Sequence, residues 1–407
     1  MGQIGPMTPP PERFEPATIA VHAGREGLRD LGVHALPIDL STTSPMPSIA
    51  AGGEAYDLLA SGVALPEGMS PIYRRAWNST VARFEEAMAA LETPRDELDT
   101  VEAIAFASGM AATTAVLLSR VAAGLPHVVA VRPLYGGTDA LLASGLLGTT
   151  VTWADAHDVA AAIQGDTGLV VIESPANPTL DLYDIRDVVR QAGAVPVLVD
   201  STFATPILQQ PLALGATYAL HSATKYIGGH GDAMGGVVAT SPERASQLRP
   251  IRTITGGVMD PWTAYLLHRG IATLPVRMQA QQANAGEIAR WLAQQPELTR
   301  VFYPGLPGAD PAGLIGRQMA GPGAMVSFEL AGGLPAAEAF CAALQLITHA
   351  VSLGGIDTLI QHPAALTHRP VDAAARPGEG ILRLSIGLEA PIDIIADLQR
   401  GLRATAR

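Results

Sequence analysis

The feature that most constrains the fold is an alternation between short apolar runs and alanine-rich helical stretches across residues 66–257. One such unit runs from the apolar segment 169–173 through the helical segment 185–191 to the apolar segment 195–199. Strands that alternate with helices in this way pack as a mostly parallel sheet covered on both faces. The sequence therefore predicts an α/β fold with a mostly parallel sheet in its larger part.

The pattern changes after residue 257, and a second, smaller α/β domain is predicted there. A long helical stretch at 261–295, interrupted at Pro275, is followed by three predicted strands and a final amphipathic helix, at 324–330, 347–352, 381–386 and 391–402. The chain is thus predicted to have three parts. They are a Pro/Gly-rich N-terminal arm with few strong helical signals (1–65), a large domain (66–257) and a small C-terminal domain (258–407).

The charge balance and the single cysteine exclude several classes of function. With 26 basic against 38 acidic residues, the net charge is −12, which disfavours binding to nucleic acid or to an anionic membrane. The sequence has no apolar run long enough to cross a bilayer and no recognisable signal peptide, so a soluble, cytoplasmic protein is expected. Cys341 alone cannot form an internal disulfide or a cysteine-rich metal site, no histidines have metal-ligand spacing, and we expect no metal.

The basic residues are 25 arginines and one lysine, Lys225. Arginine can replace lysine in most surface roles, but it cannot act as a neutral amine nucleophile because its guanidinium stays protonated. A single retained lysine therefore points to amine chemistry, although chance retention at the surface explains the count equally well. The sequence around Lys225 decides between the two.

Lys225 follows the apolar run 218–221 in a loop that also carries Ser222 and Thr224, which suits an anionic group beside an amine. Another apolar run, 195–199, ends at Asp200, 25 positions before Lys225. Asp200 alone is better explained as a strand-end turn residue. Paired with Lys225, it matches the needs of pyridoxal phosphate, in which the lysine forms a Schiff base and the aspartate keeps the pyridine nitrogen protonated.

A third segment supplies a candidate phosphate site. Residues 101–107 read as a strand, followed by the tight turn Ser108-Gly109-Met110 and a helix that begins near Ala111. Backbone N–H groups at such a helix start form an anion pocket that a glycine lets the phosphate approach. Alone the signal is weak, because many strand–turn–helix units are purely structural.

An ordered series of motifs runs from about residue 18 to the C-terminus: YRRAWNST at 73, SGM at 108, YGGT at 135, ESPANP at 173, VDSTFATP at 199, HSATKYIGGHGD at 221, SLGG at 352 and LRLSIGLE at 382. In these motifs the sequence resembles the Cys/Met-metabolism (trans-sulfuration) group of fold-type I pyridoxal-phosphate enzymes. That group includes methionine γ-lyase, the cystathionine lyases, cystathionine γ-synthase and the homoserine-ester sulfhydrylases. The resemblance implies that residues 66–257 form the cofactor-binding domain and that the arm contributes to the neighbouring subunit.

The resemblance also implies a role for each matching residue. The cofactor phosphate would be held by Gly109, Met110, Ser222 and Thr224, together with Tyr73 and Arg75 of a neighbouring subunit. The cofactor ring would be held by stacked Tyr135, by Asn177 at its phenolic oxygen and by Asp200 at its nitrogen. Lys225 and Tyr135 would move protons, while Arg383, with Ser352 nearby, would bind the substrate carboxylate. A site shared between chains implies a homo-oligomer, with a dimer as the minimum and a tetramer as the expected form.

Within this group the motifs divide between elimination and replacement chemistry. Val351 stands where enzymes that act on cystathionine commonly carry glutamate, and valine at this position is typical of methionine γ-lyase. The segments 228–232, 259–278 and 361–368 are also most similar to methionine γ-lyase. Gly137, in contrast, is shared with synthases and cystathionine lyases, whereas methionine γ-lyases usually have cysteine there. A basic residue in His368-Arg369 could meet a distal carboxylate or be a solvated loop charge.

The resemblance favours a γ-elimination lyase acting on L-methionine or L-cystathionine, which releases 2-oxobutanoate, ammonia and a thiol. A γ-replacement enzyme, either cystathionine γ-synthase or an O-acyl-homoserine sulfhydrylase, is the alternative. An inactive scaffold subunit is disfavoured because Lys225, Asp200 and Tyr135 are all present, and a nicotinamide dehydrogenase because the G-x-G-x-x-G motif is absent. The stretch 48–71 is longer than this group leads us to expect and would lie near the substrate entrance.

Overall fold

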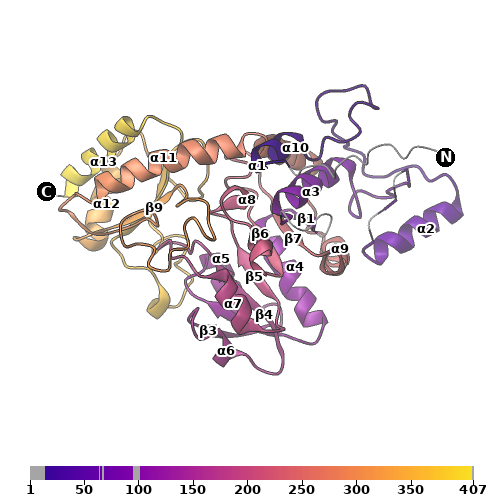
Figure 1. Cartoon of the computed structure of the whole chain (residues 1–407), viewed down its shortest axis with the longest axis horizontal. Helices are drawn as coiled ribbons and strands as arrows, with labels where there is room; N and C mark the ends of the chain where they lie inside the picture. Colours follow the sequence, from indigo (N-terminus) through magenta and orange to yellow (C-terminus); the bar gives the residue numbers. More distant parts are fainter. Residues whose placement is uncertain (1–13, 64, 67, 95–100, 406–407) are drawn as a thin grey trace, which may run out of the picture.

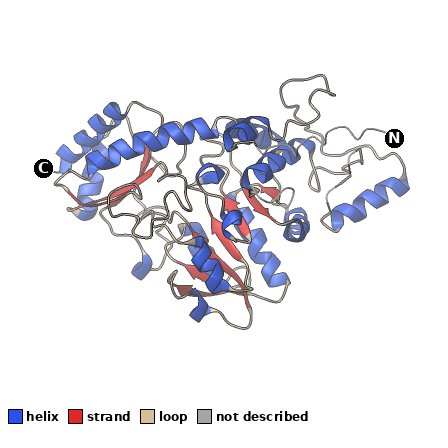
Figure 2. Ribbon diagram, viewed as in Figure 1, coloured by secondary structure: helices blue, strands red, loops and turns tan. Residues whose placement is uncertain are grey.

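The computed structural model describes residues 14–63, 65–66, 68–94 and 101–405. These residues form two β-sheets, each flanked by helices, and a peripheral N-terminal arm (Figures 1 and 2). None of the helices in this part of the chain is both long and apolar enough to cross a bilayer.

The larger sheet is seven-stranded and mostly parallel, as the sequence predicts. Its strands lie in the order β1-β7-β6-β5-β4-β2-β3, and β7 runs antiparallel to both of its neighbours. The predicted strand at 195–199 begins two residues late and includes Asp200. The bounds are β1 Glu102–Phe106, β2 His127–Val131, β3 Thr150–Ala154, β4 Thr167–Glu173, β5 Val197–Asp200, β6 Tyr218–His221 and β7 Gly236–Thr240.

Helices cover both faces of this sheet, so its strands are apolar on both sides. One face packs against α4 (Gly109–Ala122), α5 (Gly136–Ser144) and α9 (Pro242–Thr255). The opposite face packs against α3 (Ser79–Glu92), α7 (Ile185–Ala192) and α10 (Pro261–Ile271). Shorter helical segments fill the connections: α6 Val159–Ala162, α8 Thr205–Leu208 and the 3-10 turn η1 Pro211–Leu214.

The smaller sheet has the strand order β10-β11-β12-β9-β8 and packs against α11 (Leu274–Leu292), α12 (Gly333–Ala343) and α13 (Pro391–Thr405). Its strands are β8 Leu298–Phe302, β9 Met325–Leu330, β10 Thr348–His349, β11 Leu359–Gln361 and β12 Ile381–Ser385, and a 3-10 turn, η2, covers Ala373–Ala375. The predicted helical stretch is interrupted between α10, which ends at Ile271, and α11, and Pro275 lies in the first turn of α11, where its missing N–H costs nothing.

The predicted strand at 347–352 is wrong beyond residue 349. Only Thr348 and His349 pair with β11, and the chain then turns into a loop in which Ser352 adopts a φ of 89°. This left-handed backbone, which side chains other than glycine adopt at a cost, is incompatible with a continued strand. The same turn aims Ser352 at the interior of the molecule.

The N-terminal arm contains α1 (Pro16–His22) and α2 (Ile49–Ala60), so the expectation of few helical signals before residue 65 is wrong for 49–60. Ser48 caps α2 by accepting the N–H of Ala51 at 3.1 Å, and the helix continues through Gly52 and Gly53 into a segment rich in alanine and leucine. The helix lies at the edge of the molecule, away from both sheets (Figure 1). Its Ile49 and Tyr56 side chains are 97% and 64% exposed. The three-part division at residues 65 and 257 stays a prediction.

Candidate active site

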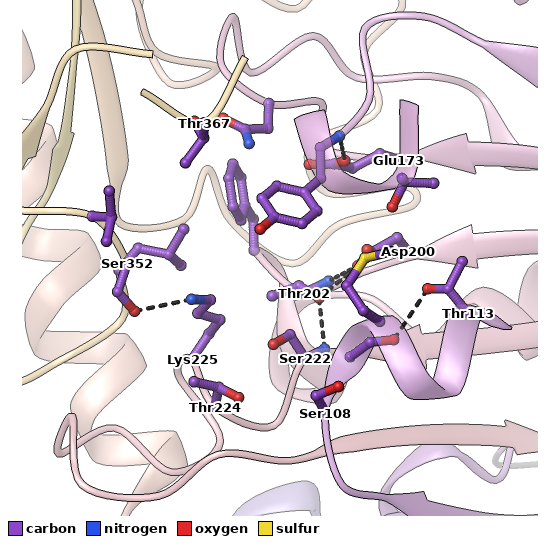
Figure 3. Close-up of a pocket in the computed structure, with 18 of the residues that line it drawn as sticks. Ser108, Thr113, Glu173, Asp200, Thr202, Ser222, Thr224, Lys225, Ser352 and Thr367 are labelled. Atoms are coloured by element: carbon purple, nitrogen blue, oxygen red, sulfur yellow. Dashed lines mark hydrogen bonds between the residues drawn. The ribbon is translucent and has the colours of Figure 1, made fainter. Parts of the chain in front are cut away.

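A cavity of about 490 Å³ opens where the carboxyl ends of β4, β5 and β6 face loops of the smaller sheet. Polar side chains from distant parts of the sequence line it, including Ser108, Asp200, Lys225, Ser352 and Arg383. In parallel sheets this edge is where ligands bind, because the connecting loops and helix N-termini converge there. Figure 3 shows Ser108, Asp200, Lys225 and Ser352 around one space, with the amine of Lys225 directed at Ser352.

Lys225 lies in the turn that follows β6, and its Nζ donates a hydrogen bond to the Oγ of Ser352 at 2.9 Å. Burial, and to a smaller degree the positive charge of Arg383, lower the pKa of Lys225 to about 8. A substantial share of this amine is therefore neutral near physiological pH. That is the state in which an amine attacks a carbonyl or accepts a proton from carbon.

Asp200 ends β5 inside the same cavity, and its close partner is Thr202. The Thr202 hydroxyl and backbone N–H both donate to Oδ1 of Asp200, at 2.5 and 3.0 Å. The same hydroxyl accepts the N–H of Ser222 at 2.9 Å, so it joins Asp200 to the loop that carries Lys225. Burial raises the pKa of Asp200, and the bonds from Thr202 oppose that rise by favouring the carboxylate. The sequence analysis missed Thr202, although it lies two residues after Asp200.

The strand, turn and helix predicted around the candidate phosphate site are present, as β1 and α4. Ser108 caps α4 by accepting the N–H of Ala111 at 3.1 Å, so the first backbone N–H groups of α4 face the cavity mouth. A Cβ added to Gly109 would lie 3.0 Å from the Cβ of Ser222, so glycine leaves open a space that a side chain would fill. Thr224 is anchored beside it by hydrogen bonds with the backbone of Gly235, at 3.0 and 3.1 Å.

Tyr135 begins α5 at the rim of the cavity and is 39% exposed. Its backbone N–H donates to Oε2 of Glu173, which ends β4, at 2.7 Å. Its ring stands over Gly137, since a Cβ there would lie 2.5 Å from Cε1 of Tyr135. The tyrosine is therefore held at its backbone and along one edge of its ring.

Arg383 is 3% exposed, yet its hydrogen-bond partners are neutral. Its guanidinium donates to Oδ1 of Asn177 at 2.8 Å, to Oε1 of Gln361 at 2.7 Å and to the carbonyl oxygen of Ser352 at 3.1 Å. Its Nε has no partner, and burial lowers its pKa to about 10. A buried cation that lines the cavity and has only neutral partners is suited to an incoming carboxylate.

Two sequence-predicted site residues lie elsewhere. Tyr73 and Arg75 do not line this cavity, and Arg75 donates to the carbonyl oxygen of Thr253 on α9 at 2.8 Å. Tyr73 is 47% exposed, and the Arg75 guanidinium lies 5.7 Å from the centre of its ring. Their placement away from the chain's own cavity accords with the expectation that they act in a neighbouring subunit, which stays a prediction.

The entrance to the cavity is apolar. Val351, Met234 and Leu366 line it and are 55%, 63% and 41% exposed. His368, considered as a basic residue for a distal carboxylate, is instead buried against the carbonyl oxygen of Asn177, and burial lowers its pKa to about 4. It is therefore neutral at physiological pH, while Arg369 is exposed and does not line the cavity.

Within the part of the chain that the structure describes, no three histidine, cysteine, aspartate or glutamate side chains are grouped to hold a metal ion. Pyridoxal phosphate, in contrast, fits the groups present. The cavity offers a partly neutral amine, an open helix N-terminus beside Ser222 and Thr224, a carboxyl group at Asp200 and an aromatic ring at Tyr135. A parallel-rich sheet with this site at its carboxyl edge defines a fold-type I pyridoxal-phosphate enzyme.

Comparison with known proteins agrees with this assignment and narrows it. Residues 17–403 match the family described as Cys/Met metabolism PLP-dependent enzyme, and the chain belongs to that family. Among its relatives is an L-methionine gamma-lyase of Brevibacterium sandarakinum, 59% identical over 392 residues, which cover 96% of this chain and 98% of the relative. An L-methionine gamma-lyase of Streptomyces avermitilis is 52% identical, with 95% and 88% covered.

Solved structures of similar fold include other activities. The metB protein of Corynebacterium glutamicum has a TM-score of 0.86 at 36% identity, covering 96% of this chain and 99% of the other. The cystathionine gamma-lyase of Lactobacillus plantarum, complexed with L-serine, has a TM-score of 0.85 at 33% identity, covering 97% and 100%. The protein is thus a pyridoxal-phosphate-dependent enzyme of sulfur amino-acid metabolism.

Proposed function

We propose that this enzyme is a carbon–sulfur lyase that cleaves L-methionine by γ-elimination, giving 2-oxobutanoate, ammonia and methanethiol. The observation that carries the choice of substrate is the apolar entrance formed by Val351, Met234 and Leu366. The cations that line the cavity within this chain are Lys225 and Arg383, and both lie at its inner end. A methyl thioether tail suits that entrance, whereas the distal amino-acid end of cystathionine would find no counter-charge from this chain. The two methionine gamma-lyase relatives support the same choice.

Each residue of the cavity has a separate role in the reaction. Bound pyridoxal phosphate supplies an electron-accepting ring and an aldehyde for which Lys225 and the substrate amine compete. Arg383 holds the substrate carboxylate and thereby presents the Cα–H bond towards Lys225. The neutral amine of Lys225, held by Ser352, would take the Cα proton and give it up again. Once neutral, the same amine could take a Cβ proton, which makes the sulfur at Cγ expellable. Tyr135 donates a proton to the departing thiolate, and water then releases 2-oxobutanoate and ammonia.

The site residues keep the roles inferred from sequence. The phosphate would be held by Gly109, Met110, Ser222 and Thr224, and the ring nitrogen by Asp200. Asn177 has a further task, because its side-chain oxygen already accepts a hydrogen bond from Arg383. It therefore links the ring's phenolic oxygen to the group that binds the substrate carboxylate.

The lyase proposal is tested by the visible spectrum and by product assay. The purified protein should show the absorption band of lysine-linked cofactor, and Lys225→Ala should lack it. L-methionine alone should then yield 2-oxobutanoate, faster than L-cystathionine does. A band that responds to substrate without forming the oxo acid until a thiol is added would favour the γ-replacement alternative, which Gly137 supports. Absence of the band after cofactor is supplied would refute the proposal.

A homo-oligomer with shared sites is part of this proposal, with a dimer as the minimum and a tetramer as the expected form. Tyr73 and Arg75 lie outside their own cavity, and the arm exposes Ile49 and Tyr56, which support contact with a second copy. Mixing Arg75→Ala and Lys225→Ala subunits tests it. Random pairing gives one intact site in four, so about a quarter of wild-type activity should return, from two variants each of low activity. If Arg75 acted within its own chain, no activity would return. A cytoplasmic location stays a prediction.

A further inference from the structure

Glu173 is a carboxyl group in the cavity to which neither the sequence analysis nor the mechanism assigns a task. It ends β4, is 5% exposed and lines the cavity beside Asp200, its direct partner in the register of β4 and β5. Figure 3 shows Glu173 and Asp200 at the ends of neighbouring strands. Two carboxyl groups placed together out of water are costly unless each has a task or a partner.

The task of Glu173 is visible in its contact with Tyr135. Oε2 of Glu173 accepts the backbone N–H of Tyr135 at 2.7 Å, at the start of α5, where no side chain caps the helix. The following two positions admit no side chain in the present backbone. A Cβ at Gly136 would lie 1.8 Å from the carbonyl oxygen of Thr367, and one at Gly137 would lie 2.5 Å from the ring of Tyr135. The backbone at Tyr135 is therefore held from the sheet side by Glu173 and from the opposite side by close packing.

The electrostatic surroundings indicate that this contact does not depend on a negative charge. Burial and the nearby Asp200 carboxylate raise the pKa of Glu173 well above its usual range. Backbone N–H groups of Tyr135 and Asn177 and the charge of Arg383 oppose that rise. A neutral carboxyl group still presents a carbonyl oxygen to a donor, so the hydrogen bond to Tyr135 survives protonation.

We propose that Glu173 is a positioning residue, whose carbonyl-type oxygen, rather than its charge, holds the backbone of Tyr135 and thereby sets the ring of Tyr135 over the cavity. The inference rests on the proposed function, because it presumes that the Tyr135 ring stacks on the cofactor and moves a proton. It extends that function by assigning the support of Tyr135 to a residue that touches neither substrate nor the reacting atoms.

Three variants separate the oxygen from the charge. Glu173→Gln keeps an acceptor oxygen at the same reach and removes any charge. Glu173→Asp keeps the carboxyl group but withdraws the acceptor by one methylene, and Glu173→Leu removes both the carboxyl group and the acceptor. We expect Gln to keep the visible circular dichroism of the bound cofactor and a kcat within about threefold of wild type. The Glu173→Asp and Glu173→Leu variants should alter the dichroism and lower kcat about tenfold or more, because the buried N–H of Tyr135 loses its hydrogen-bond acceptor. KM should change less, since Arg383 is untouched.

Glu85 provides a matched control. Its Oε1 also accepts a backbone N–H at 2.7 Å, from Ala105, and in addition pairs with Arg252 at 2.5 Å, but it lies on α3 outside the cavity. Glu85→Gln and Glu85→Leu should change thermal stability without altering the dichroism of the cofactor. Two outcomes would overturn the inference. In one, Glu173→Gln and Glu173→Leu have equal effects. In the other, Glu173→Asp keeps the wild-type dichroism and kcat while Glu173→Gln loses them. If Leu does not fold, the comparison of Gln with Asp still decides. A wild-type protein without a cofactor band would instead refute the proposed function.

Discussion

Replacement of Arg383 by lysine offers the most direct test of how the cavity recognises its substrate. The guanidinium donates to Asn177, Gln361 and Ser352 and keeps Nε free, so a carboxylate can meet a charge whose orientation is already set. Lysine retains the positive charge but cannot make these planar contacts together. Loss of one charge-assisted hydrogen bond costs about 1.5–3 kcal/mol, so we expect carboxylate binding to weaken by roughly 10- to 100-fold.

The assay uses ligands that bind without losing a γ-substituent. L-norleucine has the shape of methionine but no sulfur to expel, and L-norleucinamide lacks the carboxylate. Spectral titration of the bound cofactor gives the dissociation constant of each ligand with each protein. Arg383→Lys should weaken the binding of norleucine by roughly 10- to 100-fold and the binding of norleucinamide by less than about threefold. The two proteins and two ligands form a double-mutant-type cycle, which isolates the contact between the guanidinium and the carboxylate. Equal weakening of both ligands would refute the assignment of this contact to Arg383.

Three further outcomes follow from the same geometry. Since Lys225 is the chain's single lysine, labelling its amine in cofactor-free protein should report a pKa near 8, and Arg383→Gln should raise it. The contribution of Lys225 to the free energy of unfolding should increase from about pH 8 to 10.5, because in this window the lysine is protonated only in the unfolded chain. A labelling rate that stays constant between pH 7 and 9 would contradict the lowered pKa. Thr202→Val should weaken cofactor binding by about tenfold or more, as measured by equilibrium dialysis, whereas Thr202→Ser should not. Gly137→Ala should displace the ring of Tyr135 and alter the visible dichroism of the cofactor, and an unchanged signal would show that the ring can yield at no cost.

Local patterns in the sequence predicted the strands that place Asp200 and Lys225, because buried parallel strands are apolar on both faces and end at polar residues. Local patterns gave wrong secondary structure where the conformation depends on contacts with residues far away in the sequence. The strand expected over 347–352 ends at His349, since Ser352 turns into a left-handed conformation to reach Lys225 and Arg383, 127 and 31 positions away. The helix at 49–60 was missed because small residues and two glycines weaken its helical pattern.

The charge states of the cavity were also beyond local patterns. His368 reads as a basic residue in sequence, yet burial against Asn177 makes it neutral. Glu173 and Thr202 were overlooked although both lie within recognised motifs, because their importance rests on hydrogen bonds to Tyr135 and Asp200. Such partners are fixed by how the strand ends converge, which residue spacing does not record.

The sequence alone determined the fold class and the family and singled out Lys225 as the amine that we propose reacts, since each of these depends on residue types in short ordered motifs. The tertiary structure decided which oxygens accept from which donors, how far burial lowers the pKa of Lys225, and that Tyr73 and Arg75 lie outside their own cavity. The reason is physical. Hydrogen bonds and desolvation act over a few ångströms of space, and the residues they join here are separated by up to 206 positions of chain.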